Sequence, residues 1–389
     1  MQTEYDAIVI GAGPAGSTAA SLLAQAGWSV AVLEKQRFPR RKVCGECISA
    51  SNLPLLDALG VGDEFAALAG PELRRVALWC GPHTINAPLP ADAAARYPWG
   101  RSLGREHLDT LLLQRARQLG ACVLQPCTAR SLSGTPGELC CEVTIDGDDR
   151  ALSPRTPLII RAPLIIDARG SWQPLPAERV HARARGRRLR RGADLLAFKA
   201  NFRNVRLQEG LLPVLAFDGG YGGMVVADHG LTTVACCMRA DRLHACRAAS
   251  RGAPAGAAVE AYLRGQCTAV AEALAQACPA GPWIAAGPIR PGIRLSGRDT
   301  VFAIGNAAGE AHPIVGEGIS MAIQSAWLLC ALLVQQRDVL LRDARAQPPQ
   351  RELQQQYAAQ WRASFGTRLR VAAWLAHAAM HPGATACLL

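Results

Sequence analysis

The sequence has few lysines, few aromatic residues and no long apolar run, and each shortage narrows the range of functions. Lysine accounts for only Lys35, Lys42 and Lys199 among 42 basic residues, so the net charge of +11 rests on arginine. Aromatic residues make up 5% of the chain and are not interleaved with the arginines, which argues against a nucleic-acid partner. The most apolar stretch, residues 319–334, contains Gln324 and is too short to cross a bilayer. We expect a buried helix there and no transmembrane segment. The spacing of four residues between Tyr357, Trp361, Phe365 and Leu369 predicts a stripe that packs in the core from a C-terminal helix.

The cysteines lack the spacing of a disulfide framework, although there are 14 of them. The chain begins with the polar residues MQTEYD rather than with a signal peptide. We therefore expect free thiols and a cytoplasmic protein. A chain of 389 residues, 50% hydrophobic and 19% charged, has the composition of a globular enzyme with two packed domains or one domain with an insert.

The N-terminus carries a dinucleotide-binding pattern. An apolar strand is expected at 6–10, a helix of small residues at 17–27 and a second strand at 29–34, with Gly-x-Gly-x-x-Gly at 11–16 between the first two. Gly11 permits the tight turn, Gly13 lets the backbone approach a pyrophosphate, and Gly16 permits close contact of helix and strand. The free N–H groups of the helix start bind phosphate, and the acid that ends the second strand binds the ribose. Cofactor contacts are therefore expected from Gly11, Gly13, Pro14, Ala15, Gly16, Glu34 and Lys35.

A second segment, residues 299–326, decides between FAD and NAD. It reads as a strand, then Gly305-Asn306-Ala307-Ala308, then Pro313-x-x-Gly316-x-Gly318 opening a long helix. Here the sequence resembles the FAD-dependent oxidoreductases of the geranylgeranyl reductase and para-hydroxybenzoate hydroxylase superfamily. The resemblance extends to an Arg-x-x-Leu-Asp helix that begins at Arg105 and to residues 163–172.

The resemblance assigns roles to these residues. It implies that Asn306 meets the ribityl chain, that Arg105 lies near the FAD phosphates, and that the start of the long helix stabilises negative charge on the reduced flavin. The flavin-contacting residues it implies are Gly305, Asn306, Pro313, Gly316, Gly318 and Ile319. The chain departs from the family pattern at Asn306 and at Arg169, since both positions usually carry aspartate.

The stretch Lys42-Val43-Cys44-Gly45-Glu46-Cys47 contains the only Cys-x-x-Cys of the sequence. The resemblance implies a loop that passes the isoalloxazine ring, in which only Cys44 has a fixed position. A fortuitous pair, a working dithiol and half of a metal site stay open as alternatives, although a zinc site needs a second pair of ligands. We expect no metal.

The predicted fold class is α/β (α+β overall), a Rossmann-like FAD-binding domain with an inserted antiparallel β-sheet substrate domain and C-terminal helices. The FAD-binding domain is expected to comprise residues 1–73, 100–172 and 291–389. The substrate domain is expected to comprise residues 74–99 and 173–290. Within the first of these ranges, residues 74–89 are expected to form a hairpin. Its pocket should lie between the two domains.

The predicted function is that of an NAD(P)H-dependent monooxygenase which hydroxylates or epoxidises a small aromatic or polyketide-like metabolite through a flavin C4a-hydroperoxide. The reductant would be NADPH or NADH, bound transiently. The alternative is a reductase of conjugated or isoprenoid C=C bonds, and a third reading is a low-turnover flavoprotein that docks to a carrier protein or a membrane. The isoprenoid reductases of the family have an aromatic wall after the position of Tyr221, and this wall is absent here. Halogenases of the family carry a lysine that delivers the oxidised halogen, and nothing in the sequence assigns that role to Lys199.

Candidate catalytic residues are Cys44, His312 and Tyr221, none of which is fixed by a motif. The substrate is expected to be a small molecule, either free or bound to a carrier protein. The arginine-rich segment 179–191 is either a solvated loop or a patch for an anionic partner, and a peripheral membrane contact stays open.

Overall fold

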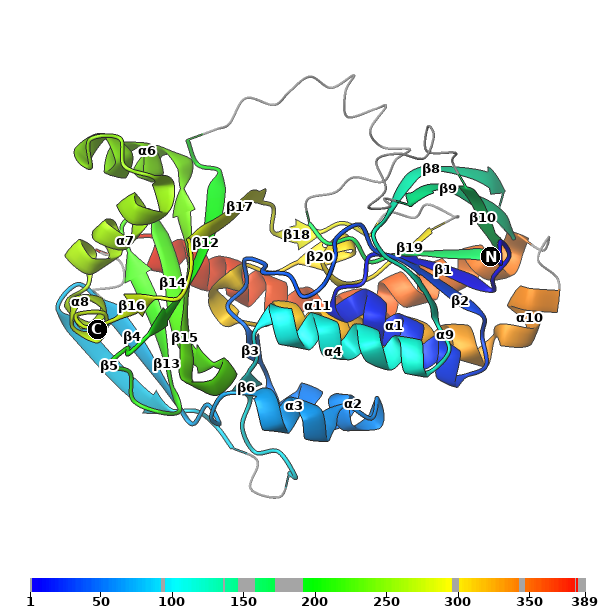
Figure 1. Ribbon diagram of the computed structural model, residues 1–389, viewed down its shortest axis with the longest axis horizontal. Coiled ribbons are helices and arrows are strands. Elements are labelled where there is room, and N and C mark those ends of the chain that lie inside the picture. The colour runs from blue at the N-terminus through cyan, green and yellow to red at the C-terminus, as the bar shows by residue number, and fades with distance from the viewer. Residues whose placement is uncertain are drawn as a thin grey trace, which may run out of the picture.

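The computed structural model describes residues 2–91, 95–135, 137–145, 158–171, 192–295, 301–342, 347–381 and 383. The arginine-rich segment 179–191 lies outside these residues. Two sheets lie at opposite ends of the molecule, and the long helix α11 (Gln347–Ala379) extends from one to the other (Figure 1).

The first unit is built on a five-stranded parallel sheet in the order β19-β11-β1-β2-β7. Its strands are β1 (Ala7–Ile10), β2 (Val30–Leu33), β7 (Cys122–Leu124), β11 (Leu164–Asp167) and β19 (Val301–Ala303). All its pairings are parallel, and β1 and β2 are buried along their whole length, as expected of apolar runs covered on both faces. The predicted Rossmann-like sheet is confirmed.

The two faces of this sheet have different covers because successive residues of a strand point to opposite sides. Ala7 and Val9 pack with helices α1 (Pro14–Gln25), α9 (Gly318–Gln335) and α11. Ile8 and Ile10 pack with an antiparallel sheet of three strands. These are β8 (Cys127–Thr135), β9 (Glu138–Ile145) and β10 (Leu158–Ala162).

Helix α9 contains the apolar stretch noted in the sequence. By length and composition it is the one helix in the described part of the chain that could cross a membrane, but 61% of its window is buried inside the protein. It packs on α1 and α11, and the predicted stripe Tyr357, Trp361, Phe365 and Leu369 of α11 is buried in the same core. The helix therefore belongs to the core of this unit.

The second unit is an eight-stranded mixed sheet in the order β16-β12-β15-β14-β13-β4-β5, with β17 paired to β12. Its central strands are β12 (Leu195–Arg203), β13 (Leu211–Phe217), β14 (Gly220–Ala227) and β15 (Leu231–Arg239). The others are β4 (Arg75–Cys80), β5 (His83–Pro88), β16 (Cys278–Pro279) and β17 (Ile284–Ile289). The hairpin predicted within 74–89 is thus β4–β5, which joins the sheet through a parallel pairing of β4 with β13.

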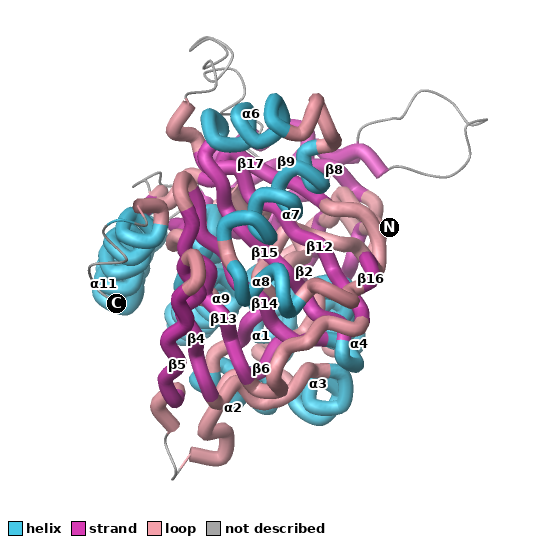
Figure 2. The backbone as a smooth tube through the Cα atoms, turned by 90° about the vertical axis from the view of Figure 1, so that its left-hand side faces the viewer, coloured by secondary structure: helices cyan, strands magenta, loops and turns pink. Residues whose placement is uncertain are grey.

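One face of the mixed sheet packs with helices α6 (Ala240–Ala249), α7 (Ala255–Gln266) and α8 (Thr268–Ala273). On β12 this face carries Phe198, Ala200 and Phe202. The alternate residues Lys199 and Asn201 therefore face the parallel-sheet unit, and both are buried. The site described below lies along this inner face, on the side of the sheet opposite to helices α6–α8, which lie in front of the sheet in Figure 2.

The remaining helices are α2 (Leu53–Ala58), α3 (Gly62–Leu68), α4 (Arg105–Gln118), which packs on α1, and α10 (Arg337–Arg342), which packs on α9 and α11. Two short strand pairs are β3 (Cys47–Ile48) with β6 (Arg101–Ser102), and β18 (Gly292–Ile293) with β20 (Gly309–Glu310).

Candidate active site

The glycine-rich turn between β1 and α1 is shaped by close backbone contacts. Gly11 has φ +102°, and a Cβ at this position would lie 2.7 Å from the carbonyl oxygen of Ala168. A Cβ on Gly16 would lie 1.8 Å from the carbonyl oxygen of Gly11. Helix α1 begins at Pro14 with no side-chain cap, so the free N–H groups of its first turn stay available to a ligand.

Glu34 closes the far side of this turn. Its carboxylate accepts hydrogen bonds from the backbone N–H of Ala12 and of Gln36, both at 2.9 Å. Lys35, by contrast, is exposed and does not line the cavity. Glu34 thus lies at the turn, as the sequence predicted. Lys35, which was also expected to contact the cofactor, points into solvent.

Three cations gather beside the start of α1. The buried Arg105 makes a bidentate ion pair with Asp109, at 2.7 and 2.8 Å, and Arg40 lies 3.3 Å from the same carboxylate. Lys42 lines the cavity nearby, and its pKa is lowered to about 8 by burial and by the positive charges of Arg105 and Arg40. A diphosphate group at this place would relieve the mutual repulsion of these cations.

The second predicted cofactor segment lies on the opposite wall of the cavity. Gly305 and Gly316 adopt positive φ angles of +57° and +67°. The amide of Asn306 donates to Ser171 Oγ at 2.9 Å and to Glu310 Oε1 at 3.2 Å, which leaves its carbonyl oxygen as an acceptor for a ligand hydroxyl.

Glu310 and Arg169 explain how the two departures from the family pattern are accommodated. Glu310 is buried and also binds Ser171 and Arg294, at 2.7 Å each, so it holds the charge that Asn306 lacks. Arg169 makes a bidentate pair with Asp167, at 2.8 and 2.9 Å, and does not line the cavity. Sequence reasoning did not identify Glu310, because a single acid between Gly309 and Ala311 carries no pattern.

The Cys-Gly-Glu-Cys loop passes between these two walls. Cys44 lines the cavity, and its thiol lies beside Arg105. Cys47 faces Gly316, and its pKa is raised to about 12 by burial and by the charges of Cys44 and Glu46. A thiol with so high a pKa is a poor nucleophile, and the raised pKa of Cys47 therefore argues against a working dithiol. The described residues contain no group of three or more His, Cys, Asp or Glu side chains that could hold a metal ion.

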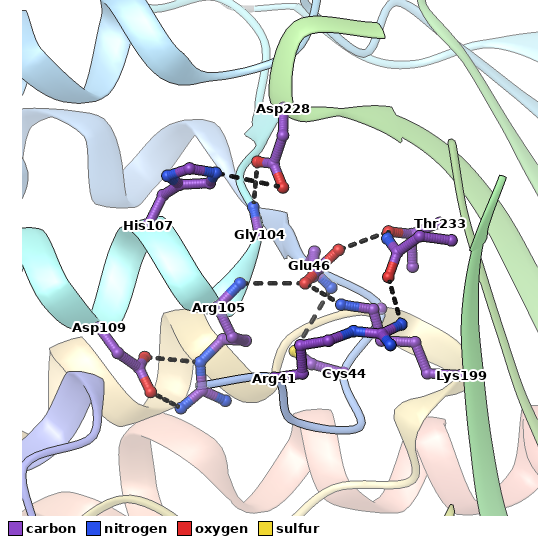
Figure 3. A network of polar contacts seen from close by, with 12 residues as sticks. Arg41, Cys44, Glu46, Gly104, Arg105, His107, Asp109, Lys199, Asp228 and Thr233 are labelled. Carbon is purple, nitrogen blue, oxygen red and sulfur yellow. Dashed lines mark hydrogen bonds and ion pairs between the residues drawn. The ribbon is translucent and has the colours of Figure 1, made fainter. Parts of the chain in front are cut away.

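Glu46 anchors this loop to the mixed sheet (Figure 3). It is 1% exposed, has φ +64°, and accepts hydrogen bonds from Lys199 Nζ, from Thr233 Oγ1 and, at 3.0 Å, from the backbone N–H of Arg105. Lys199 is also 1% exposed. The network continues from Thr233 through Asn201 to Arg41, with contacts of 2.8 and 2.9 Å.

The same region is fixed from its other end by Asp228. Its carboxylate accepts a 2.6 Å hydrogen bond from the backbone N–H of Gly104, directly before α4. A Cβ on Gly104 would lie 2.0 Å from an oxygen of Asp228, so the approach requires glycine. The start of α4, which carries Arg105, is thereby held by Glu46 of the loop and by Asp228, which follows β14 of the mixed sheet (Figure 3).

Two of the three catalytic candidates meet. The hydroxyl of Tyr221, on β14, lies 3.1 Å from Nδ1 of His312. Burial raises the pKa of Tyr221, with a smaller contribution from Cys237, and burial lowers the pKa of His312. Both side chains are therefore uncharged at neutral pH and form a pair that can share a proton. Tyr221 lines the cavity, whereas His312 stands behind it.

A single cavity of about 730 Å³ joins these features. Its cofactor side contains Gly13, Arg105 and Asn306, and its other side is the inner face of the mixed sheet. The sheet side is lined almost entirely by small and aliphatic residues, namely Val76, Leu78, Ile85, Ala87, Leu89, Ala197, Leu212, Val214, Ala216, Gly223, Val225, Ala235 and Ile289. A ligand on that side meets few hydrogen-bonding groups.

Residues 4–170 match the family model described as "FAD binding domain". This part of the chain is therefore similar to an FAD-binding domain. The match confirms the sequence-based recognition of the FAD-dependent oxidoreductase superfamily over these residues, and the fold agrees with it.

Several curated and solved proteins are similar to parts or to all of this chain. It is 36% identical over 118 residues to the tryptophan 2-halogenase of Chondromyces crocatus and 33% identical over 119 residues to the menaquinone reductase of Mycobacterium tuberculosis. These matches cover 30% and 31% of the chain, and only 22% and 28% of the two relatives.

The solved structures extend the similarity to the whole fold. The myxobacterial chondrochloren halogenase aligns over 95% of this chain and 81% of its own, with a TM-score of 0.77 and 21% identity. A geranylgeranyl bacteriochlorophyll reductase-like protein from Thermoplasma acidophilum aligns over 94% of this chain and 84% of its own, with a TM-score of 0.70 and 18% identity. At such identities the likeness establishes the fold alone.

The residues around the cavity fit FAD. Arg105 and Lys42, with the first turn of α1, would hold the diphosphate, and Glu34 would hold the ribose. Asn306 would meet the ribityl chain, and the start of α9 would face the ring system. The expected contact residues that line the cavity are Gly13, Pro14, Ala15, Cys44, Arg105, Gly305, Asn306, Pro313, Gly316, Gly318 and Ile319. Gly11 and Gly16 do not line the cavity but shape the turn next to it. Lys42 would be a further contact of the FAD diphosphate, which was not among the contacts predicted from the sequence.

Replacing Lys199 by methionine is expected to lower the free energy of unfolding by about 3–5 kcal/mol, because the Glu46 carboxylate would lose its buried counter-charge. The double variant Glu46→Gln/Lys199→Met should recover a large part of that loss. Urea unfolding of the holoprotein measures both, and the exposed Lys35→Met is the matched control. A loss for Lys199→Met no greater than that of the control would contradict a buried ion pair.

FAD affinity is expected to fall as the pH rises above about 8. Bound diphosphate raises the pKa of Lys42, so binding takes up a proton above the lowered value, and the dissociation constant grows by up to about tenfold per pH unit. Lys42→Met should weaken binding by about tenfold or more at neutral pH and remove this dependence, whereas Lys35→Met should change neither. Fluorescence titration of the apoprotein with FAD measures both quantities. The prediction is wrong if the two lysine variants bind alike.

Proposed function

We propose that the protein is a monooxygenase that transfers one atom of dioxygen to a small, largely apolar molecule of aromatic or polyketide type, by hydroxylation or epoxidation. NADPH or NADH would be the reductant, so that substrate, O₂, NAD(P)H and a proton give oxygenated substrate, NAD(P)⁺ and water. The observation that supports this best is the apolar sheet side of the cavity, which is continuous with the cofactor side. Residues 1–73, 100–172 and 291–389 would form the FAD-binding domain, and residues 74–99 and 173–290 the substrate domain.

Bound FAD would supply the redox chemistry and the activation of dioxygen. The protein supplies a dry space for the substrate. Gly223 on β14, with Ala216 and Val214 on the neighbouring β13, leaves room where larger side chains would fill the inner face. Water exclusion matters because it suppresses loss of the activated oxygen to solvent and strengthens electrostatic interactions inside the site.

The pair Tyr221 and His312 would handle the proton. In this proposal the Tyr221 oxygen accepts a proton from a hydroxyl of the substrate while the Tyr221 hydroxyl passes its own proton to His312 Nδ1. The lowered pKa of His312 keeps the imidazole neutral and able to accept. Cys237 lies beside Tyr221, but its pKa is raised to about 12 by burial, so it serves as a neutral neighbour.

Halogenation, suggested by several relatives, is less well supported by the positions of the lysines. The chain has three. Lys35 is exposed, Lys199 is buried against Glu46, and Lys42 stands among the cations of the cofactor side. Delivery of an oxidised halogen by a lysine would require one on the sheet side of the cavity, where none of these three lies.

Reduction of a C=C bond is the second candidate, and Cys44 favours it. Its thiol lines the cavity, where it could give a proton to a substrate that accepts hydride from the reduced cofactor. The similarity to a menaquinone reductase points the same way, although it covers 28% of that protein.

The reaction type is tested by following flavin absorbance when anaerobically reduced holoprotein is mixed with oxygenated buffer. A monooxygenase is expected to show a transient spectrum that belongs neither to reduced nor to oxidised flavin. Direct and slow return of oxidised flavin would count against oxygen transfer and favour C=C reduction. In that case Cys44→Ser is expected to lower the rate of substrate reduction without changing the reduction of FAD by NAD(P)H.

Tyr221→Phe removes the hydroxyl and is expected to slow turnover by about tenfold or more, since a positioned group that transfers a proton contributes about 10²–10⁴-fold. The rate of FAD reduction by NAD(P)H should be unchanged. Turnover is measured as product formed from a substrate selected in a screen of phenols and aromatic polyketides. Tyr262→Phe is the matched control, because its hydroxyl bonds the carbonyl of Asp218 outside the cavity. Equal rates for the two variants would remove Tyr221 from the mechanism.

A further inference from the structure

The last turns of α11 expose an apolar stripe. Val371, Trp374 and Leu375 are 48%, 63% and 37% exposed, and their spacing of three and four residues places them on one side of the helix. The opposite side, with Leu369, Ala372, Ala376 and Ala379, is buried. Isolated exposed apolar side chains are ordinary on protein surfaces. A group of three, of which the tryptophan is the most exposed, is typical of a contact surface.

This stripe adjoins the mouth of the cavity. Trp374 and Leu375 line the cavity, and so does Ile85 of β5, which is 44% exposed. Strand β5 is the edge of the mixed sheet and exposed along its whole length, and it lies on the same side of the molecule as α11 (Figure 2). The apolar lining of the cavity therefore continues to the surface through Ile85, Trp374 and Leu375. We call these residues, with Val371, the α11 apolar face.

The charged residues of α11 itself on either side of this face are of one sign. Residues 353–381 contain three arginines and two histidines and no carboxylate. Arg370, four residues before Trp374, is exposed, whereas Arg368 is engaged with Glu317 and Gln324. A tryptophan and aliphatic residues on one side of a helix, flanked by arginine, form the pattern of a helix that lies in a lipid–water interface.

We propose that the α11 apolar face docks the protein onto an anionic lipid bilayer and opens the cavity toward the acyl chains. An apolar substrate would then enter from the membrane without crossing water. A carrier protein fits less well, because its peptide-like arm carries amides, and the mouth residues Ile85, Trp374 and Leu375 offer aliphatic and aromatic carbon in place of hydrogen-bond partners. The docking itself does not depend on the reaction assigned above, so its test uses no turnover.

The test is co-sedimentation of the full-length holoprotein with vesicles of phosphatidylcholine alone and of phosphatidylcholine with phosphatidylglycerol. Binding is expected with the anionic vesicles, weakened by salt. Val371→Ser and Trp374→Ala should each lower the partition coefficient by about tenfold. The matched control for the first is Val339→Ser, since Val339 is 51% exposed on α10. Arg370→Ala should reduce the salt-sensitive part of the binding, and Arg203→Ala, at an exposed arginine of β12, should not.

Three results would overturn the proposal. The first is sedimentation that is no greater with anionic vesicles than without vesicles, or that falls equally for Val371→Ser and Val339→Ser. The second is a dimer in size-exclusion chromatography that Val371→Ser dissociates, because the face would then be covered by a second copy of the chain. Binding to an acidic carrier protein that needs Arg370 but tolerates Val371→Ser, with no vesicle binding, would likewise replace the membrane by a protein partner.

Discussion

The site depends on one buried carboxylate. Glu46 lies where the Cys-Gly-Glu-Cys loop meets the mixed sheet, and its oxygens are bound by Lys199, Thr233 and the backbone N–H of Arg105. A charge removed from water is tolerated only when all its partners are in place, so this contact admits one arrangement of the two units. It sets the position of Cys44 on one side and of Arg105 on the other, and thereby the width of the cavity between cofactor and sheet.

The period of a strand explains how the mixed sheet can serve both a core and a site. On β12, Phe198, Ala200 and Phe202 pack beneath the outer helices, and the intervening Lys199 and Asn201 reach the parallel-sheet unit. A shift of the register by one residue would bury the aromatic rings in the site and turn the lysine into the core. The hydrophobic packing of the outer face therefore also fixes the polar network of the inner one.

The sequence predicted those features that local patterns encode. The glycine-rich turn with Glu34, the parallel sheet and the buried stripe of α11 follow from spacing and periodicity. The polar partners of the site do not, because Glu46, Lys199 and Glu310 are single residues whose importance comes from the removal of water around them. Lys35 and Lys42 illustrate the difference. Both follow the end of β2, but only Lys42 reaches the cavity, because the loop between the two lysines leads back to it. Tyr221 and His312 were candidates individually, and their contact joins positions 91 residues apart.

The cavity has its shape because the inner face of the mixed sheet lacks large side chains. Tyr221 is followed by Gly222 and Gly223, and a Cβ on Gly223 would come within 3.1 Å of a backbone oxygen of β13. Gly223 leaves the inner face without a side chain that would fill it, while the outer face beneath α6–α8 stays closely packed. A dry space beside the cofactor therefore arises from small residues on one face of a sheet whose stability comes from the other face. Changes to the inner residues should accordingly alter ligand selection with little effect on folding, except at Glu46 and Lys199, where site and fold rest on the same contact.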